Sequence, residues 1–148
     1  MAPIVESIEI ARPAGEVFSY VVDPVHLPDW QESVVNVRRL DEGPVHEGSS
    51  VLVTRQVGPR KMTSAMQFGE LNAPTSWTIH GTDGPVRGIV RGTIEPLPDG
   101  ERSRLTIALD FEGHGIGKLL VPLFIRRMAG REMPQNERRL KTLLESGT

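Results

Sequence analysis

Few side chains of this sequence could carry acid–base or metal chemistry, and they are scattered. The four histidines, His26, His46, His80 and His114, lie in separate segments, without the His-x-His or HExxH spacing that brings two metal ligands together. The chain has no cysteine, which excludes disulfides, thiolate zinc sites and a cysteine nucleophile. The sequence therefore predicts no metal site and no cofactor, and it identifies no catalytic residue.

One charged residue falls on a predicted apolar face. Alternation through Val51 and Val53 places Arg55 on the same side of its strand. A guanidinium there costs several kcal/mol unless it is paired, so Arg55 is a candidate anchor for a ligand carboxylate or phenolate. The alternative is that Arg55 lies near the strand end and reaches solvent, or that a bulge reverses the alternation.

Two further patterns have simpler structural interpretations. Asp110 and Glu112 are two residues apart and share one face of a strand, which alternation predicts to be outward and solvated. The segment GHGIGK at residues 113–118 suggests a phosphate-binding loop but lacks the spacing of both GxGxxG and the P-loop. We interpret it as a flexible connection to the last helix.

The elements that must position these side chains can be read in order along the chain. Residues 4–10 (IVESIEI) alternate imperfectly and predict a first strand. Pro13 suits the first turn of a helix, and the apolar residues that follow it at helical spacing predict a helix that ends at Asp23-Pro24. The segment VHLPDWQE then predicts a second short helical turn, in which Trp30 offers a large apolar surface.

Six short segments separated by Gly, Pro, Asn and Asp follow, and their hairpin spacing predicts an antiparallel meander. They are SVVNVRRL, SVLVTRQV, KMTSAMQFGEL, SWTIHGT, VRGIVRGTIEPL and SRLTIALDFEG. From residue 116 onward the pattern is helical, with apolar residues such as Leu119, Phe124, Met128 and Leu140 predicted on one broad side. Pro134 is expected to kink or break this helix near residues 130–133.

The last helix is also rich in charge. Its arginines and its lysine are interspersed with Glu132, Glu137 and Glu145, a pattern typical of a solvated helix face. Docking of this basic helix to a membrane surface or to an acidic carrier protein is the weaker alternative. The pattern does not define an oligomeric state.

Length and composition limit the class of protein. A chain of 148 residues fits one domain, and 38% apolar with 24% charged residues is typical of neither a disordered nor a membrane protein. Seventeen Lys and Arg against nineteen Asp and Glu give a net charge of −2, without the basic excess that nucleic-acid binding uses. The N-terminal segment carries Glu6 and Glu9 where a secretory signal would be apolar, so we expect a cytoplasmic protein.

Three segments carry a resemblance to a known family: IARPAGEVFSYVVDPVHLPDW, GTIEPLPDGERSRLTIALDFEG and PQNERRLKTLLES. Together they resemble the START-like superfamily, also called SRPBCC or helix-grip, and within it the polyketide cyclase/dehydratase and lipid-transport group. The resemblance implies a single START-like domain over residues 1–148 with an α+β helix-grip fold. In that fold a curved seven-stranded antiparallel sheet wraps around a long C-terminal helix, and two short helices follow the first strand. It also implies a deep apolar cavity between the sheet and the long helix.

Strand alternation predicts which side chains face such a cavity. Leu109 and Phe111 share the inward face of their strand, and Gly81, Gly88 and Gly92 fall on inward faces where they add no side-chain volume. The expected lining is Trp30, Val53, Arg55, Met66, Phe68, Trp77, Ile79, Val90, Leu109, Phe111, Phe124 and Met128.

The resulting hypothesis is a carrier or sequestering protein that encloses a small hydrophobic or aromatic ligand, such as a polyketide, lipid or isoprenoid. The first alternative is an enzyme of the polyketide cyclase, aromatase or dehydratase type that uses the same cavity. The second alternative is a non-catalytic protein-interaction module. A buried acid or base in the cavity would favour the enzyme, whereas Arg55 stays protonated and offers an anchor more readily than a catalyst.

Overall fold

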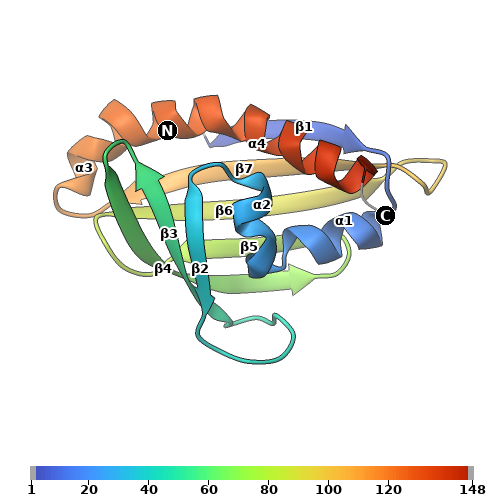
Figure 1. Cartoon of the computed structure of the whole chain (residues 1–148), viewed down its shortest axis with the longest axis horizontal. Helices are drawn as coiled ribbons and strands as arrows, with labels where there is room; N and C mark the ends of the chain where they lie inside the picture. Colours follow the sequence, from blue (N-terminus) through green and yellow to red (C-terminus); the bar gives the residue numbers. More distant parts are fainter. Residues whose placement is uncertain (1–2, 147–148) are drawn as a thin grey trace.

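The protein forms a curved antiparallel sheet with helices packed across one face (Figure 1). The computed structural model describes residues 3–146, except for the side chain of Leu123. The strands are β1 (Ile4–Ile10), β2 (Val34–Arg39), β3 (Ser50–Val57), β4 (Arg60–Asn72), β5 (Ser76–Gly81), β6 (Val86–Pro96) and β7 (Ser103–Gly113). The helices are α1 (Ala14–Val21), the 3₁₀ turn η1 (Pro24–His26), α2 (Leu27–Trp30), α3 (Gly117–Leu120), the π-helical turn η2 (Val121–Ile125) and α4 (Arg126–Ser146).

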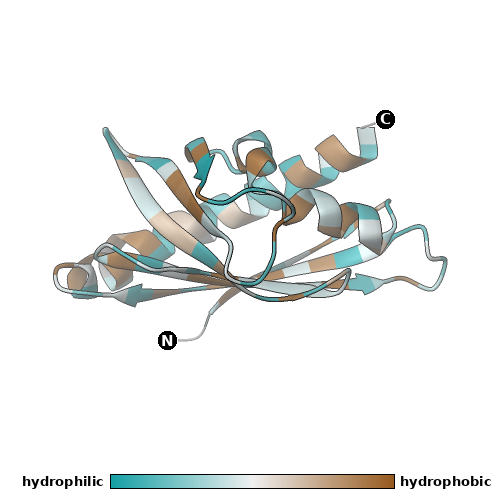
Figure 2. Cartoon of the chain, turned by 90° about the horizontal axis from the view of Figure 1, so that it is seen from below, coloured by the Kyte–Doolittle hydropathy of each residue, from teal (hydrophilic) through white to brown (hydrophobic). Residues whose placement is uncertain are grey.

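The seven strands follow the order β1-β7-β6-β5-β4-β3-β2, and every neighbouring pair is antiparallel. β1 returns to pair with the last strand, so that Ile8 lies opposite Leu105. Figures 1 and 2 show α1, α2 and the long helix α4 on the same side of this sheet, with β2 and β3 curving toward them. This arrangement confirms the predicted α+β helix-grip fold.

Local sequence explains the two short helices after β1. Pro13 precedes the first turn of α1, where a backbone N–H would have no partner within the helix, so the missing N–H of proline costs no hydrogen bond. The helix buries Val17, Phe18 and Val21 against the sheet. Asp23 then caps η1, because its carboxylate accepts the backbone N–H of Val25 at 3.1 Å. This cap fixes the direction of α2, which carries Trp30.

The end of the chain differs from the prediction. α4 continues through Pro134, so the expected break near residues 130–133 is wrong. The irregular part is η2 around Pro122, where a π-helical turn replaces α-helical hydrogen bonding. Such a turn contains more residues than an α-helical turn and rotates the helix faces that follow it. Phe124, within this turn, is 58% exposed, and Leu119, in α3 before it, is 65% exposed, although the apolar pattern places both on one buried side with Leu140.

The main core lies where β1, β7 and the C-terminal half of α4 meet. Ile10, Leu105 and Leu140 are all fully buried there, and burying each of these side chains stabilises the fold by roughly 1.5–3 kcal/mol. Phe18 packs edge-on against Trp77 with ring centroids 6.3 Å apart. Among residues 3–146, no helix is long and apolar enough to cross a bilayer.

Candidate ligand-binding site

A cavity of about 240 Å³ lies between the sheet and the N-terminal half of α4. Its walls come from β3, β4, β5, β6 and β7 on the sheet side, and from α1, α2, η2 and α4 on the other side. Most of the lining is apolar, with Val90, Leu109 and Phe111 on the sheet and Met133 on α4. The cavity therefore lies where the helix and the concave sheet face each other.

Ten of the twelve side chains expected to line a cavity do line this one. They are Trp30, Arg55, Met66, Phe68, Trp77, Ile79, Val90, Leu109, Phe111 and Met128. Val53 is only 1% exposed, but it packs with Val34 and Val51 in a separate cluster outside the lining. The expectation for Phe124 is wrong, because the π-helical turn leaves this ring at the surface.

The inward glycines have two different neighbourhoods. A Cβ at Gly92 would overlap the six-membered ring of Trp77, so this glycine provides room for the indole. A Cβ at Gly88 would meet only the ring edge of Phe111, at 3.9 Å. Gly81 and Gly88 both line the cavity, but only Gly88 leaves free space there, because a Cβ at Gly81 would lie 3.1 Å from the Cα atom of Arg87.

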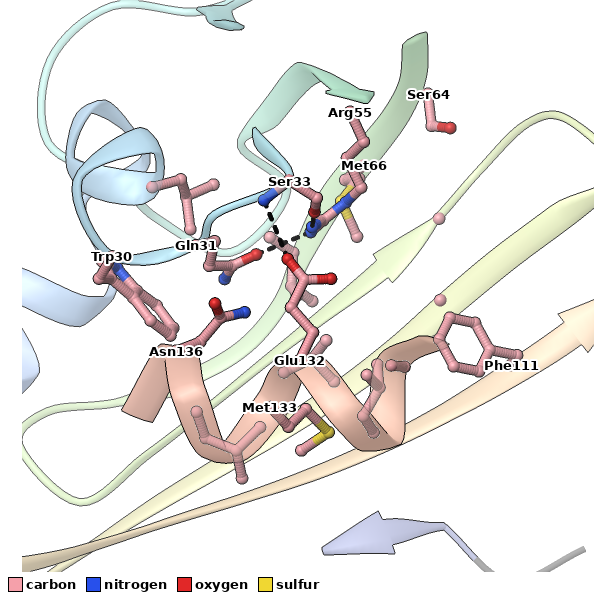
Figure 3. Close-up of a pocket in the computed structure, with 18 of the residues that line it drawn as sticks. Trp30, Gln31, Ser33, Arg55, Ser64, Met66, Phe111, Glu132, Met133 and Asn136 are labelled. Carbon is pink, nitrogen blue, oxygen red and sulfur yellow. Dashed lines mark hydrogen bonds between the residues drawn. The ribbon is translucent and has the colours of Figure 1, made fainter. Parts of the chain in front are cut away.

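The guanidinium of Arg55 is the main cationic group of the site (Figure 3). Its Nη1 donates to Ser33 Oγ and its Nη2 donates to Gln31 Oε1, both at 2.9 Å. Burial lowers the pKa of Arg55, and the nearby carboxylate of Glu132 only partly opposes this effect. An arginine side chain nevertheless stays charged at neutral pH. Arg55 thus lies in the lining with its side chain held in place.

Polar side chains of α4 join the helix to the segment after α2. Glu132 Oε1 accepts the backbone N–H of Ser33 at 2.9 Å, and Asn136 Oδ1 accepts that of Glu32 at 3.2 Å. Figure 3 shows Glu132 directed toward Ser33 beside the Arg55 guanidinium. The prediction that Glu132 belongs to a solvated helix face is therefore wrong.

Glu137 is the second acidic residue that the sequence analysis assigned to the solvated face. It is 3% exposed and lines the cavity, and neither carboxyl oxygen has a hydrogen-bond partner among the described residues. Burial raises the pKa of Glu137 to about 8, with a smaller contribution from Glu6 on β1. The spacing Met133, Glu137, Leu140 repeats at i, i+4 and i+7, which is the pattern of a buried face and could have identified it.

The other candidates lie outside the cavity. His80 is not among its lining residues, and Asp110 accepts a hydrogen bond from Arg126 at 2.8 Å. His114, within the segment interpreted as a flexible connection, lies with its Nε2 atom 2.9 Å from Glu112 Oε1 and outside the cavity lining. In that segment a Cβ at residue 117 would overlap a backbone carbonyl, so close packing accounts for its glycine.

Within residues 3–146 no cluster of three or more His, Asp or Glu side chains could hold a metal ion. The titratable groups of the lining are Arg55, Glu132 and Glu137. These groups can hold a ligand oxygen or a proton. The arrangement is therefore suited to an apolar molecule with polar groups at defined positions.

Comparison with known proteins finds a match between residues 1–145 and the family model described as polyketide cyclase / dehydrase and lipid transport.

A START superfamily protein from Mycobacterium smegmatis superposes with a TM-score of 0.80 at 16% identity, over 100% of both chains. The protein TTHA0849 from Thermus thermophilus gives 0.78 at 15% identity, over 99% of both. The Zhui aromatase/cyclase from a Streptomyces species gives 0.71 at 18% identity, over 93% of this chain and 87% of that one. At these identities the likeness extends to the fold. No protein with a curated description matches the sequence.

Proposed function

The chain belongs to the polyketide cyclase/dehydrase and lipid-transport family, and we propose that it binds a small hydrophobic or aromatic ligand, of polyketide, lipid or isoprenoid type, as a carrier or sequestering protein. The observation that carries this proposal is an apolar cavity that contains one half-buried guanidinium held by two hydrogen bonds. The ligand would lie between the sheet and α4.

The cavity can supply both affinity and orientation. Apolar burial contributes roughly 25 cal/mol per Å², so enclosing a few hundred Å² of ligand yields several kcal/mol before the entropy of binding is subtracted. A guanidinium has five N–H donors, and Ser33 and Gln31 each accept a bond from Arg55. The remaining donors can bind a carboxylate or phenolate, which would place the apolar body of the ligand against Leu109 and Phe111.

Binding of 2-naphthoate, followed by fluorescence titration or calorimetry, tests this proposal. We expect Arg55→Met to weaken binding of 2-naphthoate about 10- to 100-fold, the size of a lost charged hydrogen bond. Binding of 2-ethylnaphthalene, which has no acidic group, should change little. Arg60→Met removes an exposed arginine of β4 and serves as the matched control. If neither probe binds the wild-type protein, the carrier proposal fails.

A second candidate is an enzyme of the cyclase or dehydratase type, and Glu137 is the observation that favours it. A carboxyl group whose pKa is raised to about 8 suits a general acid. This candidate would be supported if the wild-type protein converts a model β-polyketone and the Glu137→Gln variant binds the compound without converting it. Recovery of the unchanged model compound from the wild-type protein would support the carrier.

A further inference from the structure

We propose that Glu137 is a hydrogen-bond donor of the cavity and selects apolar ligands that carry a neutral oxygen acceptor, such as a ketone or a hydroxyl group. The inference rests on the proposed function, because it concerns the same cavity. It adds a second polar contact to the one at Arg55 and so narrows the class of ligand.

The first argument is the missing partner of this side chain. Glu137 lines the cavity and is 3% exposed, yet within the described residues no group hydrogen-bonds to Oε1 or Oε2. Buried polar groups in native proteins are nearly always hydrogen-bonded, since an unmade bond there destabilises the fold. A molecule that occupies the cavity can supply the partner that the protein lacks.

The second argument is the charge around the carboxyl group. β1 brings the carboxylate of Glu6 toward Glu137, and this repulsion adds to burial in favouring the neutral form. Among the other elements in contact with α4, η2 has no titratable side chain, and Asp29 of α2 interacts with Tyr20 at 3.2 Å and with His26 at 3.3 Å. The other charged groups of the lining are Arg55 and Glu132, which lie close to each other. A neutral carboxyl group donates one O–H hydrogen bond, so it fits an oxygen acceptor.

The third argument is the position of Glu137 relative to Arg55. Glu132 lies beside the Arg55 guanidinium (Figure 3), and Glu137 follows Glu132 by five residues, a rise of roughly 7.5 Å along α4. Arg55 and Glu137 line the same cavity from different elements, so a ligand that reaches both groups has two oxygen functions joined by an apolar body. This is the chemistry of an aromatic or polyketide-like acid with a second carbonyl or hydroxyl group.

A pair of probes with matched shape separates this contact from apolar burial. The probes are 2-acetylnaphthalene, which carries a ketone, and 2-ethylnaphthalene, which does not. We expect the wild-type protein to bind the ketone about tenfold more tightly at pH 6.5, as one net hydrogen bond permits. Glu137→Leu should remove this preference and keep the affinity for 2-ethylnaphthalene. Glu137→Gln should retain most of the preference, because its amide N–H still donates.

The pH dependence of binding is a second test, which does not require the Glu137→Leu variant to fold. Above pH 8 the carboxyl group of wild-type Glu137 ionises and loses its donor, so affinity for the ketone should fall toward that for the hydrocarbon. Glu137→Gln should show no such fall, and Glu101→Gln, at an exposed residue, should behave as wild type.

Three outcomes would overturn the inference. Equal wild-type affinity for the two probes would show that no donor acts on the ketone. A ketone preference that survives in Glu137→Leu would assign the donor to another residue. Preferential binding of 2-(aminomethyl)naphthalene would show an ionised carboxylate that selects cations. Failure of both neutral probes to bind would instead refute the proposed function itself.

Discussion

Two ends of the same sheet face differ in how they are covered. At the closed end, defined by Ile10, Leu105 and Leu140, the side chains are fully buried. At the open end, defined by Gly88, Leu109 and Phe111, the same face of the sheet lines the cavity. Leu105 and Leu109 belong to one face of β7 and are four residues apart, so alternation alone does not distinguish them.

The difference arises from the elements that lie above the sheet. α1 and the C-terminal half of α4 cover the closed end with Val17, Phe18 and Leu140. At the open end the π-helical turn η2 points apolar side chains such as Phe124 to the surface. The elements above the sheet therefore contribute to the difference between the two ends, although the sheet face is mostly apolar at both.

The largest expected difference in stability between the two ends concerns the two leucines of β7. We expect Leu105→Ala to lower the free energy of unfolding by about 3 kcal/mol, because it creates a new hole in a filled core. Leu109→Ala should cost about 1 kcal/mol, because this side chain already borders empty space. Urea denaturation of both variants measures the difference, and equal losses would show that the open end is packed as tightly as the closed end.

A somewhat smaller effect concerns Glu137, which lies between the two ends. Its folded-state pKa of about 8 is above the ordinary value of 4.5, so the folded protein holds a proton that the unfolded chain releases. This contribution to stability is full below pH 4.5 and is lost as the pH rises toward 8, by about 2 kcal/mol between pH 6 and pH 8. In urea denaturation at pH 6 and pH 8, the free energy of unfolding of the wild-type protein should fall by this amount more than that of Glu137→Gln. Parallel pH profiles for the two proteins would mean that Glu137 is ionised and solvated.

The smallest expected change in stability concerns the two glycines of β6, which test how much free space each end of the sheet has. Gly92→Ala forces the Trp77 ring to move and should cost about 1.5 kcal/mol by overpacking. Gly88→Ala meets only a ring edge and should leave the melting temperature within the error of the measurement. A bulkier change, Gly88→Leu, should fill the open end and weaken binding of 2-naphthoate. If Gly88→Ala destabilises as much as Gly92→Ala, no free space exists beside Phe111.

The meander from β2 to β7 and its inward faces can be predicted from this sequence because hairpin turns and alternation are local signals, whereas the pairing of β1 with β7 is non-local. Ten of the twelve expected residues line the cavity, and eight of these ten lie on strands where alternation places them. The helical part is less predictable. A π-helical turn at Pro122 shifts the helix faces, which moves Phe124 to the surface, and Pro134 is tolerated within α4. The buried positions of Glu132 and Glu137 depend on the contacts of α4 with the segment after α2 and with β1, and a charged helix alone does not reveal such contacts.

A crystal structure of the protein saturated with 2-naphthoate tests the central claim most directly. We predict the naphthalene ring between α4 and the sheet, against Leu109 and Phe111 beside Gly88, with its carboxylate within hydrogen-bonding distance of the Arg55 guanidinium. A ring bound on the outer surface, with the space beside Gly88 closed by side chains of α4, would contradict the claim that the open end is a ligand-binding cavity.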